Sequence, residues 1–268
     1  ATVTEAVENG TLDVDKVPLI FVRIRNLAQF KAFGEKLTKQ EVKSLCGINF
    51  PKFNAENGYE NYAYLQDLNA RFDEILYGMP IIEDAVVAYK ETRMAELVGI
   101  KKILDKYRDL VLQVRVGGTD FSSVFGVRRG VDYSIYDIMM VRECLSDIIN
   151  VCGRNNDYII SGPVWEFFRV PKELMFEELP HHGIEDYLMK RLPIVNNEID
   201  GLLREVILDK ANGFVGRTVI HPTHVKFVNA LMAVTKEEYD DACQILGSDG
   251  GVVKGASGNK MNEIKPHT

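Results

Sequence analysis

The strongest constraint on the fold is an alternation of short runs rich in β-branched and other apolar residues with longer segments of helical periodicity. The runs predict strands at residues 18–25, 47–52, 75–83, 110–116, 157–161 and 213–220. The segments between them predict helices at 28–37, 59–72, 91–107, 136–151 and 184–211, the last one kinked at Pro193. Such alternation is typical of parallel strands joined by helical crossovers, so we expect an α/β fold.

The number of strands leaves two architectures open. Six strands are enough for an open, doubly wound sheet, whereas a TIM (β/α)8 barrel needs two more, which would lie upstream of Ala1. Even spacing predicts a single α/β domain over residues 1–234. Residues 235–268 differ, because a helix expected at 236–246 is followed by a loop rich in small residues. We interpret 235–268 as a lid-like tail that packs outside the main layer or on a neighbouring subunit.

Charge and composition exclude several classes of partner. With 39 acidic and 32 basic residues, the chain has a formal net charge of -7 and no general attraction to nucleic acid. No run approaches the roughly 20 apolar residues that cross a bilayer, and residues 1–5 do not resemble a signal peptide. The four cysteines lack the close pairs of zinc or redox motifs. We therefore expect a cytoplasmic protein with no nucleic-acid or membrane partner.

Charged and polar residues gather where the predicted strands end. They are Arg23 or Arg25, Lys52, Glu83, Asp120 and His221. Ligands of parallel α/β folds bind beyond the carboxyl ends of the strands, and two carboxylates with an arginine suit Mg²⁺ or Mn²⁺. Two other interpretations stay open. Glu83 could begin a surface helix, where acids are favoured, and Asp120 could be an N-cap or turn residue after Gly-Gly-Thr.

Five segments resemble one known family and occur in its order. They are residues 21–26, 47–52, 80–83, 117–121 and 213–222. The last segment, Gly-Phe-Val-Gly-Arg-Thr-Val-Ile-His-Pro, is similar to the Gly-Phe-x-Gly-Lys-x-x-Ile-His-Pro signature of the HpcH/HpaI aldolase and citrate lyase β-subunit family, with Arg217 where lysine is usual. The resemblance covers about residues 17–225, and residues 259–263 look like a divergent copy of the family's Gly-Lys-Met-Ile-Asp ending.

The resemblance implies a TIM barrel and a carbon-carbon lyase that uses Mg²⁺, with Mn²⁺ as a second possibility. Its substrate would be a small oxo-acid, or a thioester of coenzyme A or a carrier protein, cleaved through an enolate. It also implies a homotrimer or homohexamer. The family's Asp-Leu-Glu-Asp-Ala-Val motif of the second barrel strand is absent, which fits two strands missing before Ala1.

The same resemblance assigns roles to individual residues. Arg23 matches the catalytic arginine that binds the substrate's carboxylate or enolate, and Glu83 and Asp120 match the two metal ligands. Gly118 and Thr119, in the segment that carries Asp120, match substrate-binding positions. The proton-transfer group is not identified. His221 is a candidate base, although an anchoring role for its ring in the loop after the final strand is favoured.

Other features each have two interpretations. His221 and His224 could form a zinc pair, but no third ligand is adjacent. Arg128 and Arg129 could meet a phosphate or a coenzyme A tail, although paired loop arginines are more often solvated. Trp165 could line the pocket or belong to the core.

The stretch 169–191, with His181 and His182, is longer than this connection usually is in the family, which indicates an outlying subgroup. That subgroup is similar to the lyase-like proteins encoded with tellurium-resistance and stress biosynthetic genes. Two further functions remain possible for such a chain. One is a metal-dependent acyl-thioester hydrolase, and the other is a non-catalytic barrel subunit.

Overall fold

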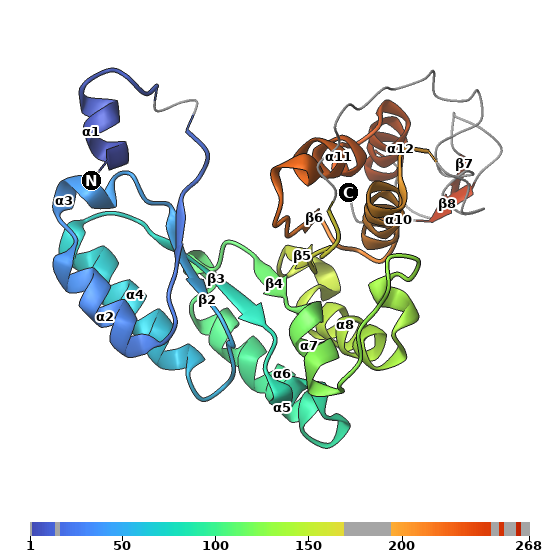
Figure 1. The fold of residues 1–268 in the computed structure, drawn as a ribbon, viewed down its shortest axis with the longest axis horizontal. Coiled ribbons are helices and arrows are strands. Elements are labelled where there is room, and N and C mark those ends of the chain that lie inside the picture. Colours follow the sequence, from blue (N-terminus) through green and yellow to red (C-terminus); the bar gives the residue numbers. More distant parts are fainter. Residues whose placement is uncertain (1, 14–16, 169–193, 248–251, 255–260, 264–268) are drawn as a thin grey trace.

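The structure, a computed structural model, describes residues 2–13, 17–168, 194–247, 252–254 and 261–263. Its centre is one sheet of six strands in the order β1-β2-β3-β4-β5-β6, each parallel to its neighbours (Figure 1). The strands are β1 (Phe21–Arg23), β2 (Gly47–Phe50), β3 (Tyr77–Ile82), β4 (Val114–Val116), β5 (Ile160–Gly162) and β6 (Gly216–Arg217). All six therefore end at the same edge of the sheet, and the predicted α/β fold is confirmed.

The helices follow the outer side of the curved sheet (Figure 1). The longer ones are α2 (Leu27–Lys36), α4 (Gly58–Phe72), α6 (Lys90–Lys106), α8 (Met139–Cys152), α10 (Asn197–Ala211) and α11 (Pro222–Met232). Local capping explains where several of them begin. Asn26 accepts a hydrogen bond from the Gln29 N–H at the start of α2, and Pro222 is the first residue of α11.

The main core lies between the sheet and these helices. Ile48 and Ile82 from the strands pack with Leu65 of α4, Leu97 of α6 and Ile148 of α8, all fully buried. Each such side chain contributes about 1.5–3 kcal/mol by leaving water. This core fixes the strand ends, and so positions the side chains that follow them.

Several elements differ from the sequence-based expectation. The ladder is shorter than the apolar runs, and β6 covers only two of the eight residues at 213–220. The exposed Leu19, Ile159 and Val215 lie in the predicted runs but shortly before the strands β1, β5 and β6 begin. Within the described residues the sheet is open between β1 and β6, as expected for six recognisable barrel strands.

Four short helices were not predicted as separate elements: α1 (Thr2–Glu8), α3 (Lys39–Val42), α5 (Ala85–Ala88) and α7 (Gly118–Val124). Each is four to seven residues long, too short for a helical periodicity to stand out. Among them, α7 matters most, because it begins two residues after β4 and carries Gly118, Thr119 and Asp120.

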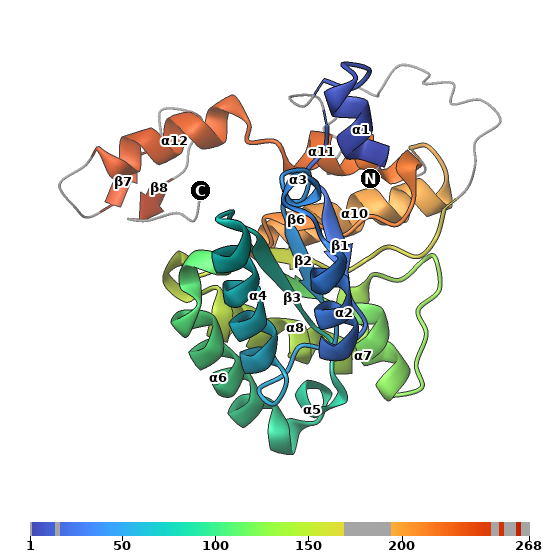
Figure 2. The ribbon, with the colours of Figure 1, turned by 90° about the vertical axis from the view of Figure 1, so that its left-hand side faces the viewer.

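The C-terminal region contains the predicted helix, α12 (Lys236–Leu246), and an antiparallel pair formed by β7 (Val252–Lys254) and β8 (Met261–Glu263). Figure 2 shows these three elements to one side of the α/β layers. The Thr235 side chain and Glu238 form a reciprocal cap at the start of α12. The rest of the expected lid loop lies outside the described residues, as do the long insert with His181 and His182 and the expected kink at Pro193. In the described part of the chain, no helix combines the length and hydropathy needed to cross a membrane.

Candidate functional site

Glu83 directly follows β3 and is held by neighbours from three elements. Its side chain is buried, and its Oε1 accepts a hydrogen bond of 3.0 Å from the backbone N–H of Lys52. The Arg23 guanidinium, at the end of β1, lies 3.7 Å from the same oxygen. A Cβ on Gly117 would come within 2.4 Å of the Glu83 Cβ and 2.6 Å of its Oε2. Only glycine at 117 therefore leaves room for this carboxylate.

Asp120 is the third residue of α7, just beyond the end of β4. It is neither the N-cap of α7, which is Gly117, nor a turn residue, so the local alternative predicted for it is wrong. The other interpretation of Glu83 was that it begins a surface helix. The structure gives that position to the next residue, because Asp84 is the N-cap of α5. The Lys52 ammonium lies 2.8 Å from Asp120 Oδ1. Lys52 thus binds Glu83 through its backbone and Asp120 through its side chain.

The backbone of Lys52 is strained where it makes these contacts. Its φ of 47° lies in the left-handed region that residues other than glycine rarely adopt. The Asn57 side chain donates a hydrogen bond of 2.9 Å to the Lys52 carbonyl and helps to hold this conformation. Strained residues of this kind cluster at functional sites. The sequence places Lys52 at a strand end but gives no sign of this double contact.

Glu83 and Asp120 influence each other electrostatically. Burial, and next the negative charge of Asp120, raise the pKa of Glu83, while the Lys52 N–H, the Lys52 ammonium and Arg23 oppose the rise. The pKa of Lys52 is raised chiefly by its hydrogen bond to Asp120. The sequence did not single out Arg115 of β4, which also interacts with Glu83. Burial lowers the pKa of Arg115, and the negative charge of Glu83 counteracts that effect.

Burial and the nearby Asp120 disfavour the charged form of Glu83, and a bound cation would offset both effects. Mg²⁺ is commonly held by one or two carboxylates together with waters and substrate oxygens. In the part of the chain that the structure describes, no cluster of three or more histidine, cysteine, aspartate or glutamate side chains could hold a metal. Glu83 and Asp120 alone would leave most coordination positions of such an ion to water and ligand oxygens.

The two substrate-binding residues expected in α7 lie beside Asp120. Gly118 is buried against Pro163, whose Cβ would lie 2.9 Å from a Cβ at position 118. Thr119 is exposed and donates a hydrogen bond of 2.8 Å to Glu166 Oε1. The structure thus brings Arg23, Glu83 and the start of α7 to the same edge of the sheet. Glu166, in the loop after β5, is a neighbour that the sequence did not single out.

His221 is the N-cap of α11. Its Nδ1 lies 2.8 Å from Thr223 Oγ1, and its ring stacks on Phe168 at a centroid distance of 4.2 Å. These contacts match the anchoring role that was favoured for this ring. The rings of His221 and His224 are 6.0 Å apart, and His224 is fully buried, which lowers its pKa.

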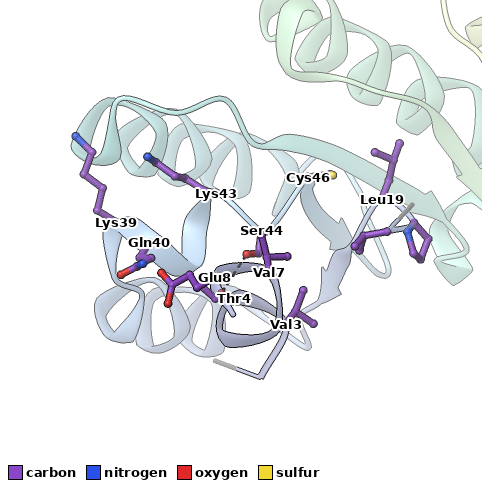
Figure 3. Close-up of a pocket in the computed structure, with 12 residues that line it drawn as sticks. Val3, Thr4, Val7, Glu8, Leu19, Lys39, Gln40, Lys43, Ser44 and Cys46 are labelled. Carbon is purple, nitrogen blue, oxygen red and sulfur yellow. Dashed lines mark hydrogen bonds between the residues drawn. The ribbon is translucent and has the colours of Figure 1, made fainter. Parts of the chain in front are cut away.

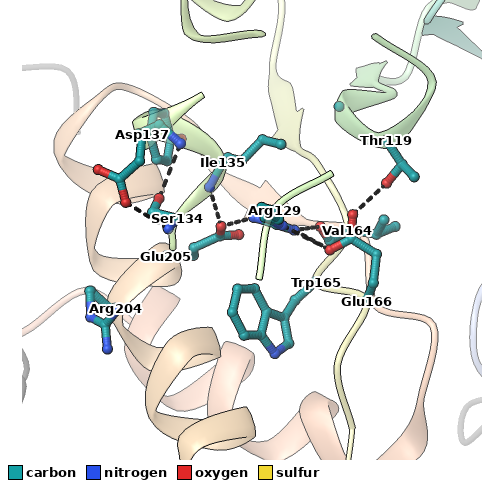
Figure 4. A network of polar contacts seen from close by, with 12 residues as sticks. Thr119, Arg129, Ser134, Ile135, Asp137, Val164, Trp165, Glu166, Arg204 and Glu205 are labelled. Carbon is teal, nitrogen blue, oxygen red and sulfur yellow. Dashed lines mark hydrogen bonds and ion pairs between the residues drawn. The ribbon is translucent and has the colours of Figure 1, made fainter. Parts of the chain in front are cut away.

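A buried network of charged side chains lies next to α7 (Figure 4). Arg217 pairs with Glu205 and Asp209 of α10, and Arg129 pairs with Glu205 and Glu166. The expectation that Arg129 is solvated is wrong, because its side chain is only 3% exposed and lies over the Trp165 ring. Trp165 itself belongs to the core, which was one of its two interpretations from the sequence.

A cavity of about 600 Å³ lies at the opposite edge of the sheet (Figure 3). It is lined by residues of α1, α3 and the segments that precede β1 and β2, among them Val3, Leu19, Lys43 and Cys46. The Thr4 and Ser44 hydroxyls, 3.0 Å apart, join its two sides. Since Glu83 and Asp120 follow the carboxyl ends of their strands, this cavity is separate from the candidate site.

The fold and this edge define a parallel α/β protein in which two carboxylates, Glu83 and Asp120, lie with Arg23 and Lys52 at the carboxyl ends of the strands. The family described as C-C bond lyase of the TIM-barrel fold matches residues 1–268, and the chain belongs to that family. No curated protein sequence matched the chain.

Two solved structures are similar to this chain. CitE from Mycobacterium tuberculosis, in complex with magnesium, acetoacetate and coenzyme A, aligns with a TM-score of 0.50 and 15% identity, over 97% of this chain and 77% of that one. RipC from Yersinia pestis aligns with a TM-score of 0.49 and 15% identity, over 82% of this chain and 79% of that one.

Proposed function

We propose that this protein is a magnesium-dependent carbon-carbon lyase that cleaves a small oxo-acid or acyl thioester through an enolate. The observation that carries the proposal is the convergence of Glu83 and Asp120 on Lys52, with Arg23 3.7 Å from Glu83. Membership of the carbon-carbon bond lyase family gives the reaction class. The complex of CitE with magnesium, acetoacetate and coenzyme A supports both the metal and the substrate class.

Glu83 and Asp120 are the residues that would hold Mg²⁺, or Mn²⁺ in its place. The bound metal would polarise the substrate carbonyl and stabilise negative charge on its oxygen. Arg23 is the catalytic residue that binds the carboxylate or enolate oxygen, because a guanidinium grips such groups with two parallel hydrogen bonds. Gly118 and Thr119 bind the substrate at the first turn of α7. The bound cation would supply a compensating charge beside the buried Glu83.

Wider properties of the protein belong to the same proposal. The resemblance supports a cytoplasmic homotrimer or homohexamer whose residues 235–268 pack on a neighbouring subunit, with residues 1–234 as the barrel domain. The long insert and Arg217 support the subgroup of lyase-like proteins encoded with tellurium-resistance and stress genes. Coenzyme A and carrier-protein thioesters are the candidate activated substrates.

A test of the function is an assay of candidate thioesters and hydroxy acids with Mg²⁺, followed by identification of the products. Release of an aldehyde or keto acid supports the lyase, and release of the free acid alone supports the alternative thioester hydrolase. The Glu83→Gln and Asp120→Asn variants should lose turnover. Glu60→Gln, a control at an exposed position of α4, should retain it. No Mg²⁺ binding to the intact protein would instead favour a non-catalytic barrel subunit.

A further inference from the structure

The cavity at the opposite edge of the sheet has two chemically different ends (Figure 3). Val3 of α1, with Val17 and Leu19 ahead of β1, lines an apolar end. Lys39 and Lys43 lie at the other end, which Figure 3 shows on the side away from Leu19. The volume of about 600 Å³ is typical of small-molecule pockets, which span about 300–1,000 Å³. The cavity therefore suits a ligand with one apolar and one polar end.

The polar end carries an excess of positive charge. Lys39 and Lys43 contribute two ammonium groups, and among the described residues that line the cavity only Glu8 is acidic. The chain as a whole has a formal net charge of -7, so this local charge is opposite in sign to the rest of the molecule. Neither lysine forms an ion pair within the described part of the chain. An anion bound here would give both ammonium groups a partner.

The spacing of the two lysines adds to this argument. Lys39 is the first residue of α3 and Lys43 is its C-cap, four positions later. Side chains four positions apart on a helical turn are neighbours, and like charges at that spacing repel each other. A compact anion between the two ammonium groups would offset the repulsion. An ammonium is a point charge, so it does not demand the flat two-oxygen geometry that a guanidinium prefers.

The remaining lining residues narrow the class of ligand. The Thr4 and Ser44 hydroxyls lie 3.0 Å apart and already satisfy each other, which leaves the lysines as the main donors for a ligand. The described lining includes no aromatic ring on which a nucleobase could stack. Its apolar side chains are aliphatic and favour a flexible alkyl chain. An aliphatic carboxylate combines this chain with the anion that the lysines require.

We propose that this cavity is a second ligand site, which binds a medium-chain aliphatic carboxylate. The alkyl chain lies at the apolar end, and the carboxylate lies between Lys39 and Lys43. Burial of the chain supplies most of the affinity, and the lysines determine the preference for an anion. The inference goes beyond the proposed function and does not depend on it, because the cavity lies at the edge of the sheet opposite to Glu83 and Asp120.

Cys46 lines the cavity and can report its occupancy. It is a free, half-buried thiol, and the free, exposed Cys243 on α12 is an internal control outside the cavity. The experiment follows alkylation of each thiol by iodoacetamide in the intact protein, by mass spectrometry, with decanoate, decanol or acetate. Decanol keeps the chain without the charge, and acetate keeps the charge without the chain.

The proposal predicts a specific pattern of protection. Decanoate should slow the alkylation of Cys46 at concentrations about fivefold lower than decanol, as expected for a favourable exposed ion pair. Acetate should have no effect, and Cys243 should react at the same rate throughout. The double variant Lys39→Met with Lys43→Met should lose the preference for decanoate and keep the protection by decanol. Lys36→Met, at an exposed position in the last turn of α2, is the matched control and should keep the preference.

Four results would overturn the inference. They are equal protection of Cys46 by decanoate and decanol in the wild type, no protection at the highest soluble concentration of decanoate, and a decanoate preference that survives in the double variant. The fourth is slower alkylation of Cys46 at higher protein concentration without ligand, which would show that a second copy covers the cavity. A Mg²⁺ titration of the same protein tests the metal site, so failure of either proposal is recognised separately.

Discussion

The Lys52 ammonium lies 2.8 Å from Asp120 Oδ1, while the Lys52 backbone N–H binds Glu83. A single residue in a left-handed conformation therefore contacts both carboxylates that we assign to the metal. The Lys52 ammonium is the partner of Asp120 within the chain. A metal ion bound by Asp120 must therefore share this carboxylate with Lys52 or displace Lys52 from it. This relationship leads to the first prediction.

Replacement of Lys52 by methionine should tighten Mg²⁺ binding by about two- to fivefold. The pair with Asp120 is largely exposed, so its removal is worth at most about 1 kcal/mol. The measurement is a Mg²⁺ titration at low ionic strength. Lys43→Met, at the opposite edge of the sheet, is the matched control and should bind Mg²⁺ as the wild type does. Unchanged affinity in Lys52→Met would show that the ammonium does not compete with the metal.

Gly117→Ala should disrupt the position of Glu83. The new Cβ would lie 2.4 Å from the Glu83 Cβ, so the carboxylate or the backbone must move. We expect a loss of about 1–3 kcal/mol in the free energy of unfolding, as for other overpacked sites, and weaker Mg²⁺ binding. Urea unfolding and Mg²⁺ titration measure the two effects. Gly216→Ala, where no atom lies within 4 Å of the added Cβ, should change neither property.

The pH dependence of stability should report the environment of Glu83. Burial and Asp120 raise its pKa above the ordinary value of 4.5, so the folded protein disfavours the ionised form. The contribution of Glu83 to the free energy of unfolding is fully present below pH 4.5 and is lost as the pH rises through the raised pKa. Glu83→Gln should therefore gain stability relative to the wild type over that rise. Urea unfolding at a series of pH values measures this difference, and a difference that is constant with pH would contradict the prediction.

Arg217→Met should destabilise the fold strongly. Arg217 is fully buried and contacts Glu205 and Asp209, which would lose their partner. Breaking a buried ion pair costs about 3–5 kcal/mol. Arg217→Lys, which restores the residue usual at this position, should lose less because a cation remains. Arg128→Met, at an exposed position, should stay within about 0.5 kcal/mol of the wild type in urea unfolding.

The sequence predicts the framework well, because strand runs and helical periodicity are local signals. The order of six parallel strands and the polar residues at their ends follow from it, and Glu83 and Arg23 lie where they were expected. The short helix α7 was missed, since seven residues beginning Gly-Thr-Asp show no apolar stripe. The double contact of Lys52 and the burial of Arg129 depend on residues 31 or more positions away, so no local pattern predicts them.

The most direct test of the account is the structure of crystals soaked with Mg²⁺ and oxaloacetate or pyruvate. The account predicts an ion bound by oxygens of Glu83 and Asp120, with the Arg23 guanidinium on the ligand's carboxylate or enolate oxygen and Lys52 moved from Asp120. Ordered Glu83 and Asp120 side chains with no ion between them, at saturating Mg²⁺, would contradict it.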